Sequence, residues 1–129
     1  MNAPKTILIV DDDPAVRAVL KTRLNNSGFR TLEANEGLSV VALAQRERPD
    51  LILLDVVMPG QDGIEVYTAL REASATKETP VIFLTALSQG LDPSKFLNPT
   101  TNYWVLGKPY RPEQLLQSIQ QALGMPIVP

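Results

Sequence analysis

Four short apolar runs divide this chain, and each of them ends next to residues with polar or charged side chains. The runs cover residues 7–10, 51–54, 81–84 and 103–106. An unbroken run of this length, without polar alternation, is typical of a strand that is buried on both faces of a parallel sheet. We therefore expect four strands whose carboxyl ends meet at one edge of a sheet, with Asp55 directly after the second run.

The segments between these runs carry the period of amphipathic helices. Asp13 and Pro14 form an N-cap signal for the first helix, and Gly28 is its stop signal. The expected buried face of this helix consists of Val16, Val19, Leu20 and Leu24. Three more helices are expected. One covers about residues 36–47, a second begins at the capping box formed by Asp62 and Glu65, and the last runs between Pro112 and Gly124.

Strands that alternate with helices predict a doubly wound α/β sheet. Residues 30–34 alternate polar and apolar side chains, which predicts a shorter strand near a sheet edge. Glycine and prolines interrupt any helical period in residues 88–102, so we expect short turns there and an irregular fourth helix. The length suits a single domain over residues 1–129, with a folded core at about 5–124 and a tail or linker at 125–129.

The composition narrows the classes of function. With 44% hydrophobic residues and a net charge of −2, the chain lacks the basic excess of nucleic-acid-binding proteins, so no direct nucleic-acid contact is expected. Cysteine and histidine are both absent, which leaves carboxylates, hydroxyls, lysines or a hard metal ion for any chemistry. The first residues show no signal-peptide pattern and the apolar runs are too short to span a membrane, so we expect a cytoplasmic protein.

Charged and hydroxyl side chains gather at the expected strand ends. Asp11 and Asp12 follow the first run and Asp55 follows its neighbour, and three carboxylates this close repel one another unless a cation lies among them. Mg²⁺, or a similar cation such as Mn²⁺, prefers such oxygen ligands. Thr85 and Lys108 follow the other two runs and add a hydroxyl and a positive charge. The set is typical of a site that receives a phosphoryl group on a carboxylate oxygen.

Each of these residues also has a simpler interpretation. Asp13 is most simply a helix cap, Thr85 a strand-end hydroxyl and Lys108 a solvated charge. Asp11 and Asp13 also form an Asp-x-Asp pair after a strand, as in aspartate-nucleophile phosphohydrolases, although the chain is too short to include a cap domain. A third interpretation is an interaction module that keeps the fold but is never phosphorylated, which the unusual residues 88–102 would suit.

In combination, these segments resemble the receiver domain of two-component response regulators. The resemblance rests on residues 7–13, 53–60, 62–63, 84–86 and 108–110. It implies a flavodoxin-like five-stranded parallel sheet in the order 2-1-3-4-5 with helices on both faces. It also implies a phosphoprotein of signal transduction that promotes only its own phosphorylation and dephosphorylation. A sensor histidine kinase or a histidine phosphotransfer protein would donate the phosphoryl group, and a downstream protein would read the result.

The same resemblance assigns roles to individual residues. Asp55 would be the phosphoacceptor, with Thr85 and Lys108 as partners of the phosphoryl group. The Mg²⁺ ligands would be Asp11, Asp12, Asp55 and the backbone carbonyl of Val57. The oligomeric state stays open, and a homodimer is compatible with the sequence.

Two features depart from the usual receiver pattern. Val105 replaces the aromatic residue expected three positions before the lysine, so either Trp104 acts as the switch with Thr85 through a β-bulge or that coupling is lost. Val57 and Leu87 stand where receivers often carry polar side chains that orient water. Because apolar side chains offer an attacking water no hydrogen bond, we expect a long-lived phosphorylated form.

Overall fold

The computed structural model describes residues 4–35, 37–55, 57–58, 61–86, 103–108 and 110–124, with the backbone alone at 37–38, 57–58, 61–64 and 85–86. Five parallel strands form the main sheet in the order β2-β1-β3-β6-β7. These strands are β1 (Thr6–Val10), β2 (Arg30–Ala34), β3 (Leu51–Asp55), β6 (Val81–Ala86) and β7 (Tyr103–Lys108). Numbered within this sheet alone, the order is 2-1-3-4-5, so the predicted flavodoxin-like topology is confirmed.

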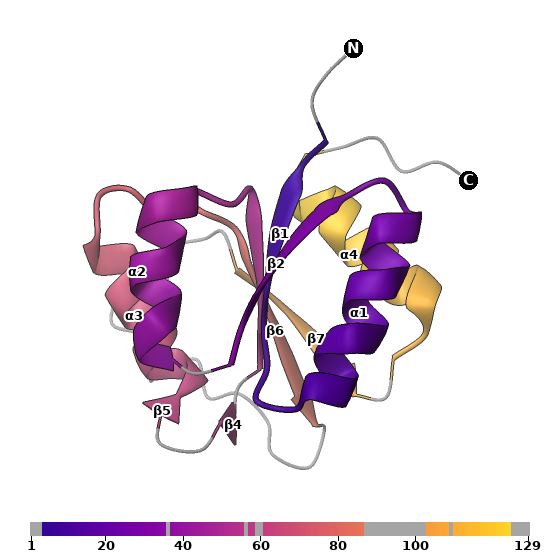
Figure 1. Ribbon diagram of the computed structural model, residues 1–129, viewed down its shortest axis with the longest axis horizontal. Helices are drawn as coiled ribbons and strands as arrows, with labels where there is room; N and C mark the ends of the chain where they lie inside the picture. Colours follow the sequence, from indigo (N-terminus) through magenta and orange to yellow (C-terminus); the bar gives the residue numbers. More distant parts are fainter. Residues whose placement is uncertain are drawn as a thin grey trace.

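Within the described residues, four helices cover the two faces of the sheet. They are α1 (Pro14–Asn26), α2 (Gly37–Glu47), α3 (Gly63–Glu72) and α4 (Pro112–Ala122). Helices α2 and α3 lie on one side of the sheet, and α1 and α4 lie on the other (Figure 1). A small antiparallel hairpin, β4 (Val57–Met58) with β5 (Gln61–Asp62), follows β3.

Local sequence signals set the ends of α1 as predicted. Asp13 has extended backbone angles (φ −89°, ψ 113°), and its side chain accepts a hydrogen bond of 2.9 Å from the N–H of Ala15. Pro14 follows in the first turn, where its missing N–H costs nothing. At the other end Gly28 has a φ of 94°, a conformation that favours glycine and turns the chain out of the helix. Asp13 is therefore a helix cap, in agreement with its simplest interpretation.

Both faces of the sheet are buried, which explains why the central strands lack polar alternation. One core lies between the sheet and α2 and α3, and β1 and β3 contribute to it Leu8, Val10, Ile52 and Leu54. A second core lies against α1 and α4, and the same two strands contribute to it Ile7, Ile9, Leu51 and Leu53. All eight of these side chains are at most 1% exposed. The prediction of a doubly covered parallel sheet is therefore confirmed.

The predicted buried face of α1 is wrong at one position. Val19 is 51% exposed, whereas Leu20 and Leu24 are each only 2% exposed. At about 100° per residue, Val19 lies roughly 140° around the helix from Leu24, so it projects away from the sheet. Val16, Leu20 and Leu24, spaced four residues apart, make the face that packs.

The pairing of β6 with β7 excludes the β-bulge in one of the two alternatives for Trp104. Six consecutive residue pairs join the two strands, from Val81 with Tyr103 to Ala86 with Lys108, so there is no β-bulge between them. Trp104 packs against the core beside α1 and α4, while Tyr103 packs against the opposite core. The expected irregular segment at residues 88–102 lies outside the described residues.

Candidate functional site

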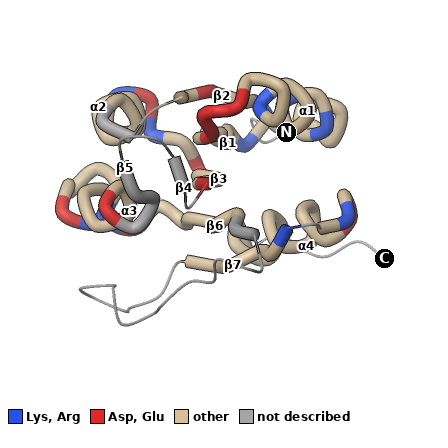
Figure 2. The backbone as a smooth tube through the Cα atoms, turned by 90° about the horizontal axis from the view of Figure 1, so that it is seen from below, with Lys and Arg blue, Asp and Glu red and all other residues tan. Residues whose placement is uncertain are grey.

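The carboxyl ends of the five parallel strands meet at one edge of the sheet. Figure 2 looks onto this edge and shows acidic positions where β1 and β3 end. The neighbouring strands β1 and β3 pair Val10 with Leu54, which places the residues that follow each of them side by side. Such an edge is the usual ligand position in open α/β sheets. The sequence predicted a site here for the same reason.

Three carboxylates come together at this edge. Asp11, Asp12 and Asp55 each offer one oxygen, and these oxygens all lie within 4.8 Å of one another. Asp11 is buried, Asp55 is half-buried and Asp12 is exposed. The predicted cluster is therefore present in the fold. The negative charges of the three carboxylates repel one another at these distances.

Asp11 is the most constrained of the three carboxylates. Its Oδ1 accepts a hydrogen bond of 2.9 Å from the N–H of Asp13, while its buried Oδ2 has no hydrogen-bond partner among the described residues. Burial raises the pKa of Asp11 above its usual range. The hydrogen bond from Asp13 and the charge of Lys108 lower this pKa, and the charges of Asp55 and Asp12 raise it further.

Lys108 brings a positive charge to the cluster from the end of β7. Its Nζ lies 3.9 Å from Oδ1 of Asp55, and the two side chains are 34% and 14% exposed. The backbone of Thr85 lies one pair earlier in the β6–β7 ladder, opposite Gly107. The sheet therefore holds Asp55 and Lys108 close together although they are far apart in the sequence.

The donor set fits a hard divalent cation. Mg²⁺ prefers oxygen ligands and often binds one or two carboxylates while it keeps several waters. Three carboxylate oxygens within 4.8 Å and a buried Oδ2 of Asp11 without a partner among the described residues meet that preference. Mn²⁺, which takes similar oxygen ligands, is compatible with the same set.

Several predicted residues are only partly described. Val57 begins β4, two residues after Asp55, and the direction of its carbonyl group stays a prediction. The side chain of Thr85 and all of Leu87 lie outside the described residues. Trp104 lies in β7 on the side of α1 and α4, and its role as a switch stays a prediction.

Sequence reasoning gave no role to two residues that interact with Asp11. Arg17 in α1 donates a hydrogen bond of 2.6 Å from Nη1 to the backbone oxygen of Asp11. Tyr110 is partly buried against the core beside α1 and α4. Burial raises the pKa of Tyr110, Arg23 lowers it and Asp11 raises it. The sequence does contain a signal for the position of Arg17: it comes four residues after the cap Asp13, which places it about one helical turn into α1 and near the start of the helix.

Fold and site together define a class of protein: a doubly wound α/β module with an acidic cluster and a lysine at the carboxyl edge of its parallel sheet. The sequence profile of the response regulator receiver domain matches residues 7–120 of this chain. The chain therefore belongs to the receiver domain family, and it is a module of two-component signalling.

Solved structures of receivers are closely similar to this chain. The receiver domain of a sensor histidine kinase from Pseudomonas aeruginosa is 30% identical, with a TM-score of 0.82 that covers 95% of this chain and 99% of that one. That structure has a magnesium ion coordinated in the active-site cleft. The chemotaxis protein CheY4 of Vibrio cholerae is 33% identical, also with a TM-score of 0.82, and covers 94% of this chain and all (100%) of that one.

Curated relatives include larger regulators. The DNA-binding dual master transcriptional regulator RpaA of Synechocystis is 36% identical over 117 residues, which is 91% of this chain and 48% of that protein. The DNA-binding response regulator MtrA of Mycolicibacterium smegmatis is 34% identical over 117 residues, or 50% of its length. The chain thus spans about half the length of the curated relatives it matches. In the described part of the chain, none of the helices is long and apolar enough to cross a membrane.

Proposed function

We propose that this chain is a phosphoacceptor receiver, which takes a phosphoryl group from a phosphohistidine onto Asp55 in the presence of Mg²⁺. The observation that carries the proposal is the meeting of Asp11, Asp12 and Asp55 within 4.8 Å, with Nζ of Lys108 at 3.9 Å from Asp55. A nucleophilic carboxylate beside a fixed positive charge and a set of metal-binding oxygens is what phosphoryl transfer to an aspartate requires.

The transfer is a displacement at phosphorus. An oxygen of Asp55 attacks the phosphorus and forms a P–O bond while the P–N bond to the donor imidazole breaks. The imidazole nitrogen keeps the electron pair and takes up a proton, and Asp55 becomes an acyl phosphate. Mg²⁺, when bound, neutralises negative charge on the phosphoryl oxygens. Lys108 supplies a second positive charge beside Asp55, and Thr85 donates a hydrogen bond to the phosphoryl group.

The metal ligands in this proposal are Asp11, Asp12, Asp55 and the backbone carbonyl of Val57. Asp12 is the most accessible of the three carboxylates and would hold the ion directly, while Asp11 would contribute through water. The donor is a sensor histidine kinase or a histidine phosphotransfer protein. A downstream protein recognises the changed surface, since the charge at the edge of the sheet differs before and after transfer.

Intact-mass measurement after incubation with phosphoramidate, with and without Mg²⁺, tests the proposal. The wild type is expected to gain the mass of one phosphoryl group only with Mg²⁺, and Asp55→Asn to gain none. An adduct that persists in Asp55→Asn would reject Asp55 as the acceptor, and full labelling in excess chelator would reject the metal requirement. A wild type that never reacts but binds a partner protein would identify a receiver that works without phosphorylation.

Continued turnover of a phosphate ester by Asp55→Asn would instead favour the aspartate-nucleophile phosphohydrolase. In that enzyme class the nucleophile would come from the Asp11–Asp13 pair. Asp13, however, already caps α1 through its hydrogen bond to the N–H of Ala15, so this pair is committed to holding the helix start. The phosphoacceptor proposal therefore explains the described contacts better.

A further inference from the structure

The peptide group between Asp11 and Asp12 is held by a long side chain from α1. Nη1 of Arg17 donates a hydrogen bond of 2.6 Å to the backbone oxygen of Asp11. That oxygen belongs to the peptide plane that joins the two aspartates. Its orientation sets the directions in which the carboxylates of Asp11 and Asp12 leave the backbone, because successive side chains are related through the dihedral angles on either side of that plane.

The rest of Asp11 is fixed as well. Its N–H donates a hydrogen bond of 3.2 Å to the carbonyl of Ala34 at the end of β2, and its Oδ1 accepts from the N–H of Asp13. The contact with Arg17 is therefore the third anchor of this residue. Like the bond from the N–H of Asp13 to the Asp11 carboxylate, it involves a charged group, and such hydrogen bonds are roughly twice as strong as neutral ones.

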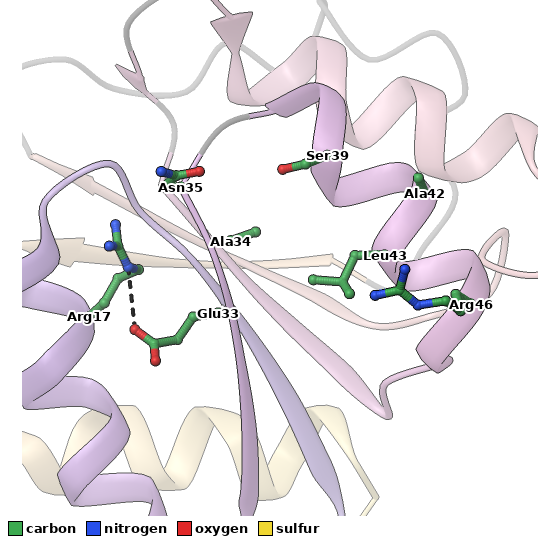
Figure 3. A pocket seen from close by; sticks show the side chains of 8 residues that line it. All are labelled: Arg17, Glu33, Ala34, Asn35, Ser39, Ala42, Leu43 and Arg46. Carbon is green, nitrogen blue, oxygen red and sulfur yellow. Dashed lines mark hydrogen bonds and ion pairs between the residues drawn. The ribbon is translucent and has the colours of Figure 1, made fainter.

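Arg17 is itself held in place from the sheet edge. Its Nε lies 3.3 Å from Oε1 of Glu33 in β2, and Nζ of Lys21 lies 3.5 Å from Oε2 of the same carboxylate. Figure 3 shows Arg17 and Glu33 pointing toward each other from α1 and β2. The side chain of Arg17 is only 16% exposed, compared with 50% for Lys21. The guanidinium group thus bridges an outer carboxylate and the peptide group inside the site.

We propose that Arg17 is a positioning residue for the metal site, which it controls by fixing the peptide group between Asp11 and Asp12. This inference rests on the proposed function of the carboxylates as Mg²⁺ ligands. It assigns Arg17 no contact with the metal ion or with the phosphoryl group. Groups that orient metal ligands commonly change metal affinity by about 10- to 100-fold when they are replaced.

The fork shape of the guanidinium group makes the proposal specific. Arg17 uses two of its nitrogens for two acceptors in different elements, Asp11 and Glu33. A lysine carries the same charge but has a single nitrogen on a flexible stem. Arg17→Lys therefore keeps the charge near the site while it loses the simultaneous contact with both acceptors.

The test compares Mg²⁺ dissociation constants, measured by titration calorimetry, with melting temperatures in EDTA. For both Arg17→Lys and Arg17→Gln, Mg²⁺ binding is expected to weaken by about tenfold or more. Lys21→Met is the matched control. Lys21 lies on the same helix as Arg17 and also pairs with Glu33, so this variant removes a neighbouring cation and leaves the bond between Arg17 and Asp11 intact. Its Mg²⁺ affinity is expected to stay within about twofold of the wild type, because exposed ion pairs contribute little.

A merely structural role predicts the opposite pattern. If both Arg17 variants melt earlier in EDTA but bind Mg²⁺ as the wild type does, Arg17 only fastens α1 to β2 and the proposal is wrong. Should the Arg17 variants fail to fold, Glu33→Ala provides the decision, because it removes the acceptor that holds Nε of Arg17 in β2 and leaves the Arg17 side chain itself intact. Unchanged Mg²⁺ affinity in that variant would overturn the proposal. A wild type that binds no Mg²⁺ would instead reject the proposed metal site itself, so the two failures are distinguishable.

Discussion

Replacing Asp11 by Asn is expected to stabilise the metal-free protein while it weakens Mg²⁺ binding. Asp11 is 3% exposed, its Oδ2 has no hydrogen-bond partner among the described residues, and a second carboxylate oxygen, from Asp55, lies within 4.8 Å. Asparagine keeps an oxygen that can accept from the N–H of Asp13 and removes the negative charge. Its amide nitrogen also becomes a donor beside the carboxylate oxygens of Asp12 and Asp55.

The size of the effect follows from the separation of the charges. Two like charges within 4.8 Å repel by about 3 kcal/mol at an effective permittivity of about 20. Lys108, at 3.9 Å from Asp55, offsets part of this repulsion, and water screens another part. We therefore expect the free energy of unfolding of Asp11→Asn to rise by about 1–2 kcal/mol, or about 4–8 °C in melting temperature for a chain of this size.

The pH dependence gives an independent signature. Burial raises the pKa of Asp11 in the folded state above its ordinary value of 3.8, so the folded protein holds this proton to a higher pH than the unfolded chain does. The resulting contribution to stability is fully present below about pH 3.8 and is lost as the pH rises through the raised folded pKa. In metal-free buffer the stability advantage of Asp11→Asn should accordingly grow with rising pH across that window.

Urea unfolding in EDTA and in Mg²⁺, at several pH values, measures these effects. A ligand that binds only the folded state at about 100 times its dissociation constant adds about 2.7 kcal/mol, so Mg²⁺ should stabilise the wild type strongly and Asp11→Asn much less. Asp13→Asn is the matched control, because it removes a charge two residues after Asp11, outside the carboxylate cluster, but keeps a good helix cap. If Asp11→Asn is less stable than the wild type in EDTA and gains as much from Mg²⁺, the reasoning from charge repulsion is refuted.

Three further predictions follow from other residues. Lys108→Met should lower the melting temperature more in EDTA than in Mg²⁺, since the cation takes over the charge compensation; an equal loss in both buffers would contradict this. The double variant Val57→Asn with Leu87→Glu should lose its phosphoryl group about tenfold faster or more, and a half-life unchanged from that of the wild type in Mg²⁺ would show that these residues do not control water access. Leu53→Ala should lower the free energy of unfolding by about 2–5 kcal/mol, because Leu53 is 0% exposed between the sheet and its helices; a loss below about 1 kcal/mol in urea unfolding would show that the core collapses around the gap.

The sequence predicts the sheet well because the relevant signals are local. The apolar run before Asp55 is continuous since both faces of β3 are covered, and this pattern needs no knowledge of the partners. The gathering of Asp11, Asp12 and Asp55 also follows, because parallel strands share one carboxyl edge. The order of the strands therefore predicts that these residues, which are far apart in the sequence, lie in one cluster.

Other features escape a reading of local patterns. Val19 satisfies the apolar composition of α1, but its angular position on the helix turns it to solvent at 51% exposure. The sequence left a bulge at Trp104 as one of two alternatives, and the uninterrupted ladder between β6 and β7 excludes it. The position of an aromatic residue in the sequence does not reveal which face of the sheet it takes. Glu33, one of the two partners of Arg17, lies in β2, 16 residues away, so no helical period could indicate this contact.

A metal site requires negative charge and a fixed arrangement of its ligands, and in this chain different residues, Asp11 and Arg17, supply the two. Asp11 contributes charge, and its burial in the metal-free fold opposes stability, as its raised pKa shows. Arg17 contributes geometry, because its bond to the backbone oxygen of Asp11 orients the peptide group without adding a ligand. Removing the charge should therefore increase metal-free stability and decrease Mg²⁺ affinity, whereas removing the bridge should decrease Mg²⁺ affinity without that gain in stability. Asp and Asn are nearly the same size, so Asp11→Asn would relieve no steric crowding. A higher free energy of unfolding of Asp11→Asn in EDTA, together with weaker Mg²⁺ binding, would therefore identify an electrostatic site and not a merely crowded one.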